Sequence, residues 1–273
     1  MVWLRPGARG ISALVAGFLS FAALPAFSVG PYTDVSATSA FIRAPHEPGL
    51  IGSITRANSQ GEGASLFDIA GFFPVRSSFL IQLETSYITL ARGDEVIEGF
   101  GDALLWLKAR TWTGDRKALF LESCVRFGVG STQYFPYSTA STDVEALVAF
   151  VDSLGFDGDE GTPPPSRFLS YWIAAGGTLV LRLNDRLEAE GLHDDHASVG
   201  GGILVTFSRR FEIEIGGRGL FFGSGAAREI YFSQITAALS PATDLLVTVQ
   251  GERGDWQERA IDASAGVGLT VRY

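Results

Sequence analysis

The chain has 273 residues, a hydrophobic share of 46% and a formal net charge of -9, with 30 acidic against 21 basic residues. The acidic balance argues against nucleic acid as a partner, because phosphate binding needs an excess of Lys and Arg. Beyond residue 28 no stretch of 18 residues is free of charge, which excludes transmembrane helices and leaves alternating strands as the way to place so much apolar surface.

The N-terminus has the layout of a secretory signal. Two arginines precede an uncharged apolar run over residues 11–24, and a small-x-small site follows at 26–28. A transmembrane anchor is the alternative, but the run is shorter than the roughly 20 residues that a spanning helix needs. We therefore expect a signal peptide at 1–28 that is cleaved after Ser28.

From residue 77 onward, apolar residues occupy every second position in segments of about ten residues. Ile81 and Leu83, for example, flank the polar Gln82. A period of two predicts strands, because successive side chains of a strand point to opposite faces. Together with weaker segments the pattern gives about twelve strands, an even number as in single-chain bacterial barrels. The weaker segments are 50–58, 65–73 and 186–193.

The pattern predicts an all-β fold, a transmembrane antiparallel up-and-down β-barrel at 49–273, preceded by a periplasmic segment at 29–48. Both ends of the barrel then lie in the periplasm, with short turns on that side and longer loops outside. The last strand alternates from Ile261 to the terminal Tyr273 and resembles the assembly signal of outer-membrane barrels. This resemblance implies the barrel-assembly machinery and outer-membrane lipid as partners, and the outer membrane of a Gram-negative cell as the location.

The longest outer loop is expected at 130–166, and it contains apolar residues at helical spacing over 142–154. An amphipathic helix must cover its apolar stripe, so we expect it to pack over or into the mouth of the barrel as a gate. Packing on other loops alone is the alternative. The gate candidates are Val144, Leu147, Phe150 and Val151.

Polar and charged residues alternate with the lipid-compatible face and are expected to line the barrel interior. Charges at such density must be paired across neighbouring strands, hydrated, or both, because each unpaired buried charge costs several kcal/mol. They form either a structural network in the wall or a polar pathway for a small solute. The predicted lumen-lining residues are Glu84, Asp102, Trp106, Lys108, Arg110, Glu122, Arg126, Arg182, Glu188, Glu190, Glu212, Glu214, Arg218, Glu252 and Asp262.

One segment, His193 to His196, combines imidazoles and carboxylates as a general base or a metal site would. Adjacent residues of a strand point to opposite faces, so solvated turn residues are the alternative. The sequence has no phosphate loop or nucleophile motif, and we expect no catalytic residue, metal or cofactor. The glycine run 200–202 fits a thin patch of wall that another element approaches closely.

The stretch from Gly99 to Lys108, followed by a tight turn and by Phe127 to Gly130, resembles the putative outer-membrane transporters of the meta-cleavage pathway of phenol degradation. The resemblance implies a transporter for small, aromatic or hydrophobic molecules. A channel for small solutes is therefore the leading functional hypothesis. The alternatives are an outer-membrane enzyme with its site near His193 to His196, and a barrel with a structural or anchoring role.

Overall fold

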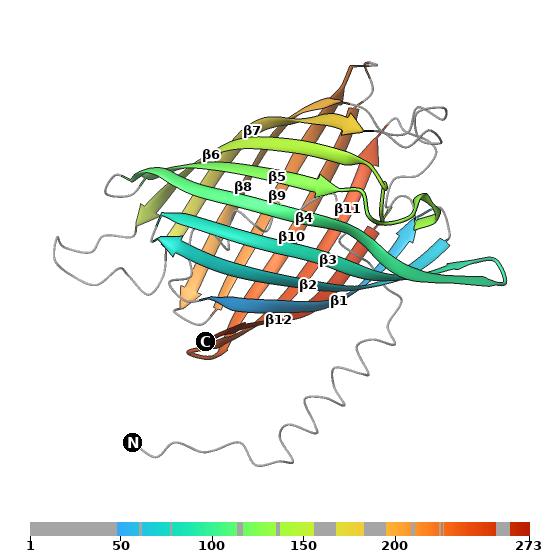
Figure 1. Ribbon diagram of the computed structural model, residues 1–273. Helices are drawn as coiled ribbons and strands as arrows, with labels where there is room; N and C mark the ends of the chain where they lie inside the picture. The colour runs from blue at the N-terminus through green and yellow to red at the C-terminus, as the bar shows by residue number, and fades with distance from the viewer. Residues whose placement is uncertain are drawn as a thin grey trace, which may run out of the picture.

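The computed structural model describes residues 48–59, 62–76, 78–113, 117–134, 137–155, 168–182, 195–208, 211–223, 225, 227–254 and 263–273. In this part of the chain 12 strands pair antiparallel with their sequence neighbours, and β1 pairs with β12 to close a barrel (Figure 1). The predicted all-β barrel of about twelve strands is therefore confirmed. The strands are β1 (Gly49–Ser59), β2 (Glu62–Arg76), β3 (Phe79–Arg92), β4 (Glu95–Thr113), β5 (Lys117–Phe127), β6 (Thr142–Gly155), β7 (Phe168–Arg182), β8 (His196–Ser208), β9 (Phe211–Phe222), β10 (Ala227–Ser240), β11 (Thr243–Gly254) and β12 (Ala263–Arg272).

The two faces of the wall differ in composition, as the period of two predicts. Apolar side chains on the outside are exposed to the surroundings, with 53% of Leu83 and 58% of Ile173 accessible. Inward-facing side chains on the same strands are buried, as for Gln82 on β3 and Trp172 on β7. An apolar exterior around a polar interior is the arrangement of a barrel that spans a membrane. No helix within the described residues is long and apolar enough to cross a bilayer.

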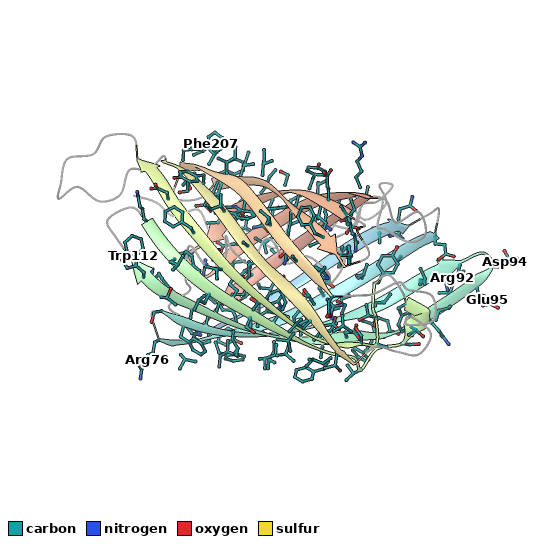
Figure 2. All side chains as sticks on the ribbon, turned by 90° about the horizontal axis from the view of Figure 1, so that it is seen from above. Arg76, Arg92, Asp94, Glu95, Trp112 and Phe207 are labelled. Carbon is teal, nitrogen blue, oxygen red and sulfur yellow. The ribbon has the colours of Figure 1, made fainter. Side chains whose placement is uncertain are left out.

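The barrel has two distinct ends, which Figure 2 shows from above. Arg76 and Phe207 lie at one end, where the β2–β3 and β8–β9 turns and the C-terminus are also found, and we call it the termini end. Arg92 and Glu95 lie at the other, the loop end. Outward aromatic pairs lie near both ends, Phe207 with Phe211 at 5.8 Å and Tyr87 with Phe100 at 5.4 Å between ring centroids. Aromatic rings in such positions are typical of the interfaces of a lipid bilayer.

The predicted helix at 142–154 is wrong, because these residues form β6 between β5 and β7. Leu147 and Val151 face inward, whereas Val144 and Val148 lie on the outward positions. The middle of β6, from Ala146 to Val151, is apolar on both faces, so it matches a helical spacing as well as an alternating one.

β6 lies within the expected outer loop at 130–166 and divides it, because β5 ends and β6 begins at the loop end, whereas β6 ends and β7 begins at the termini end. Of the weaker strand candidates, 50–58 and 65–73 are confirmed as β1 and β2. The candidate 186–193 lies outside the described residues, as do the expected signal peptide and N-terminal segment up to residue 47. The barrel closes with β7 paired directly to β8.

Candidate functional site

The barrel interior is the candidate site, and most predicted lumen-lining residues lie on its inner face. Arg182 belongs to β7, but its side chain is outside the described part, and Glu188, Glu190 and Asp262 are outside it entirely. The predicted residues that face inward are Glu84, Asp102, Trp106, Lys108, Arg110, Glu122, Arg126, Glu212, Glu214, Arg218 and Glu252.

Carboxylates outnumber basic groups on the inner face of the described strands. Asp143 and Glu145 lie within the predicted helix 142–154 and were therefore not predicted as lining residues, although the alternation at the start of β6 places both on one face. The inward carboxylates are Glu62, Asp68, Glu84, Asp102, Glu122, Asp143, Glu145, Glu212, Glu214, Asp244 and Glu252, and the inward basic groups are Arg92, Lys108, Arg110, Arg126, Arg218, Arg228 and Arg272.

Several of these charges form ion pairs along the wall. Arg218 on β9 forms an ion pair with Glu145 on β6, across the two strands β7 and β8, and it also donates a hydrogen bond to Ser198 on β8. Gly176 on β7 and Gly200 on β8 occupy inner-face positions of the two strands that separate this pair, and a Cβ on Gly200 would lie 3.4 Å from the Arg218 Cβ. Two further ion pairs join adjacent strands: Arg228 on β10 pairs with Glu252 on β11, and Arg272 on β12 pairs with Asp244 on β11.

Lys108 on β4 is fully buried, and its position shows how this interior holds a positive charge. Its Nζ lies 5.0 Å from the centroid of the Trp106 ring and 3.5 Å from the Gln82 side-chain oxygen. Glu122 on β5 is its direct partner in the register. The Lys108 ammonium group is therefore stabilised by an aromatic face and an amide oxygen, and its neighbour on the adjacent strand is an acid.

In the connection between β5 and β6, residues 128–134 and 137–141 fold into the loop end of the barrel, and we call them the inserted loop. Thr139 and Ser141 are fully buried within it. Its two tyrosines, Tyr134 and Tyr137, pack against inward side chains of β1, β2 and β3. Gly99 on β4 makes room for Tyr134, because a Cβ there would lie 2.2 Å from the tyrosine hydroxyl.

Three charged residues hold the inserted loop, and we call them the loop latch: Asp102, Arg126 and Asp143. The Asp102 carboxylate accepts hydrogen bonds from the Thr139 N–H at 2.8 Å, the Thr139 hydroxyl at 3.1 Å and the Gly130 N–H at 3.2 Å. Arg126 lies between the two acids, 3.8 Å from Asp102 and 3.3 Å from Asp143. Backbone N–H groups bound by a carboxylate fix the loop in one position.

Closer to the termini end the interior is filled by apolar side chains, which we call the inner aromatic layer. They come from strands on different sides of the barrel and bury one another. Trp172 on β7 and Phe232 on β10 stack with 6.2 Å between ring centroids. The layer consists of Phe72, Leu80, Phe120, Ala149, Val151, Trp172, Ala174 and Phe232.

Glycines of the wall provide the space in which the rings of this layer lie. A Cβ on Gly202 would meet the Trp172 ring at 2.8 Å, and one on Gly216 would lie 2.7 Å from Phe232 and 2.9 Å from Trp172. The glycine run 200–202 was expected to allow a close approach, and at Gly202 the approaching group is the indole. The Trp172 Nε1–H also donates a hydrogen bond to Glu214 at 2.8 Å, which fixes the ring in its plane.

The predicted gate residues divide between the two faces of β6. Val151 belongs to the inner aromatic layer, and Leu147 packs against it. Val144 and Phe150 occupy outward positions of the strand. Two of the four residues thus belong to the inner aromatic layer or pack against it, although the predicted helix that was to carry them is a strand.

The histidine segment is only partly described. His193 and Asp194 lie outside the described residues. Asp195 is exposed and accepts a hydrogen bond from the Val180 N–H at 2.7 Å, and the His196 ring packs 5.0 Å from that of Phe222. Among the described residues no group of three or more His, Cys, Asp and Glu is placed to hold a metal ion.

No protein family and no curated protein matches the sequence. Solved structures do match the fold. A KdgM porin in complex with disordered oligogalacturonate has a TM-score of 0.52 at 9% identity, over 82% of this chain and 99% of that one. A NanC porin has a TM-score of 0.53 at 9% identity, over 81% and 100% of the two chains. An outer membrane channel from Pseudomonas putida F1 has a TM-score of 0.57 at 10% identity, over 83% and 94%. The chain therefore shares the barrel fold of these proteins.

Proposed function

We propose that this protein is an outer-membrane channel for small solutes, and that the inner aromatic layer closes its lumen at rest. The observation that carries the proposal is the combination of an apolar exterior, an interior rich in charged pairs, and one apolar layer across that interior. A barrel that served only as an anchor would need no inward-folded loop held by buried charges. The similar folds of porins and of a channel support the same function.

The proposal includes a route to the membrane. Residues 1–28 are a signal peptide that is removed after export, and 29–48 form a periplasmic segment. The C-terminal strand, ending at Tyr273, is recognised by the barrel-assembly machinery, and the exposed apolar belt then faces outer-membrane lipid.

The chemistry of the closed layer favours solutes with an apolar or aromatic group. A solute that crosses must displace contacts among Phe72, Phe120, Trp172 and Phe232, and it replaces them best with contacts of the same kind. This agrees with the resemblance of the Gly99 to Lys108 stretch to transporters of the phenol meta-cleavage pathway. Polar solutes without such a group cross more slowly, because they leave the displaced rings without partners.

Removing a ring from the layer tests the proposal. In planar bilayers, Trp172→Ala and Phe232→Ala are expected to give a larger single-channel conductance than the wild type, because each deletes an aromatic ring from the apolar barrier. Tyr231→Ala is the matched control, since Tyr231 adjoins Phe232 on the same strand but faces outward with 54% of its surface exposed.

Folding of each variant is checked by its mobility on gels before and after heating. If correctly folded wild type, Trp172→Ala and Phe232→Ala all give no conductance, the channel function is refuted and an anchoring role is favoured. If Tyr231→Ala changes the conductance as much as Phe232→Ala does, the inner aromatic layer is not the barrier.

A further inference from the structure

The inserted loop contains a strained backbone position at Ala140. This residue has a φ of 51°, and no other described residue except glycine has a positive φ. A side chain in this left-handed region brings its Cβ too close to the following carbonyl oxygen, so glycine is the residue that normally occupies it. The inserted loop therefore carries a conformational cost that a glycine at position 140 would not have.

The loop latch holds Ala140 in this conformation from both sides. Thr139 is bound to Asp102 through its N–H and its hydroxyl. Ser141 donates a hydrogen bond from its hydroxyl to the Asp143 carboxylate at 2.8 Å. Strained positions persist only where the surrounding structure fixes the neighbouring residues, and here the two acids of the latch do so. The strain is therefore relieved only when the latch lets go of the loop.

The backbone around Ala140 is packed closely against the other end of the loop. A Cβ on Gly128 would lie 2.4 Å from the Ala140 carbonyl carbon, and one on Gly130 would lie 2.2 Å from the Ser138 hydroxyl oxygen. Elements packed at this density change between discrete arrangements and do not deform continuously. Relief of the strain thus requires the loop to leave its place in the barrel.

Cys124 lies where it reports on movement of the loop. The inner face of β5 carries Phe120 of the inner aromatic layer, then Cys124, then Arg126 of the loop latch. Cys124 is 5% exposed and is the single cysteine of the chain. A reagent that enters at the loop end therefore meets this thiol before it reaches the layer.

We propose that the inserted loop is a strained gate at the loop end, in which the conformation of Ala140 favours release and the latch opposes it. Release relieves the strain and opens a path from the loop end to the interior around Cys124. The gate goes beyond the channel function proposed above, because it controls entry at the loop end whether or not a solute then crosses the inner aromatic layer.

The rate at which Cys124 reacts with a small methanethiosulfonate reagent measures opening of the gate. The full-length mature protein is folded in detergent, and the reaction is followed by mass spectrometry. Ala140→Gly is expected to slow the reaction about threefold, the net result of strain relief in the inserted loop and greater freedom of the released one. Gly128→Ala is expected to speed it about tenfold, because the added Cβ displaces the Ala140 backbone.

Gln133→Gly is the matched control, because Gln133 is exposed in the same loop and has no positive φ. This substitution adds a glycine without relieving strain, so the reaction should be unchanged or faster. If Ala140→Gly reacts as fast as the wild type or faster, the strain at Ala140 does not drive release and the proposal is refuted. The same conclusion follows if Gln133→Gly slows the reaction as much as Ala140→Gly does.

Two other results would also overturn the gate. If Trp172→Ala speeds the reaction and Gly128→Ala does not, the reagent enters past the inner aromatic layer. If Cys124 stays unreactive in folded wild type, Gly128→Ala and Asp102→Asn but reacts after unfolding, the loop does not open. Because the thiol reaction requires no conductance, failure of the gate is distinguishable from failure of the channel function.

Discussion

Replacing Asp102 by Asn should release the inserted loop without changing the size of the side chain. In the wild type, one oxygen of Asp102 accepts both the N–H and the hydroxyl of Thr139, and the other accepts the N–H of Gly130. An Asn has only one acceptor oxygen, so an amide NH₂ must face a donor at one of the two positions. The substitution also removes the negative charge that lies 3.8 Å from Arg126.

The size of the effect follows from the bonds that are lost. Hydrogen bonds to a charged group contribute about 1.5–3 kcal/mol each. In Asp102→Asn at least one of the three hydrogen bonds is lost, and the remaining ones go to a neutral amide oxygen instead of a charged carboxylate. A total of about 3 kcal/mol corresponds to a roughly hundredfold shift toward the released loop. Since Tyr134 and Tyr137 are 6% and 1% exposed in the folded loop, release makes them accessible.

Limited proteolysis with chymotrypsin measures this shift, because cleavage after the two tyrosines requires an open loop. When opening is fast compared with cleavage, the rate follows the population of the open form and should rise by up to about a hundredfold in Asp102→Asn. Asp68→Asn is the control, since Asp68 is also an inward acid but takes its hydrogen bonds from Ser53 and Ser86. Equal cleavage after Tyr134 and Tyr137 in wild type and Asp102→Asn would refute the latch.

Two further substitutions test the wall itself. Arg218→Ala removes the partner of the largely buried Glu145 and should lower the free energy of unfolding in detergent by about 1–3 kcal/mol, which is less than for a pair fully shielded from water. Arg218→Lys should have an intermediate effect. No change in the free energy of unfolding would show that the pair is solvated and does not stabilise the fold. Val148→Lys places a charge on the outward face at the middle of β6 and should reduce the free energy of folding into lipid vesicles by about 2–4 kcal/mol. Val96→Lys, beside the β3–β4 turn, should reduce it by at most about 1 kcal/mol. Equal effects of the two substitutions would contradict a membrane-spanning wall.

The sequence was sufficient to predict the barrel, because the period of two depends only on neighbouring residues. Where both faces are apolar that signal is lost, and this happened in β6, whose inward Leu147 and Val151 meet the inner aromatic layer. The predicted count of twelve was nevertheless confirmed. The twelve predicted strands included the segment 186–193, which lies outside the described residues, and did not include β6.

The inner aromatic layer could not be predicted, since it depends on the register of strands that are distant in sequence. Trp172 lies over Gly202 and Gly216 only because β7, β8 and β9 pair in one particular register. A shift by two residues would keep every side chain on its face but would bring other residues under the ring. Phe72 had no sequence feature that separated it from the outward Phe73 beyond the phase of alternation.

The inserted loop and the inner aromatic layer differ in chemistry, and under the proposed channel function this difference determines how each can open. The inserted loop is held at the loop end by hydrogen bonds to charges, which water or ions can replace when the loop moves. The inner aromatic layer has few polar groups, so water entering it gains little, and a solute with its own apolar surface is the better replacement. A polar solute can therefore reach the interior past the loop and still be stopped at the layer.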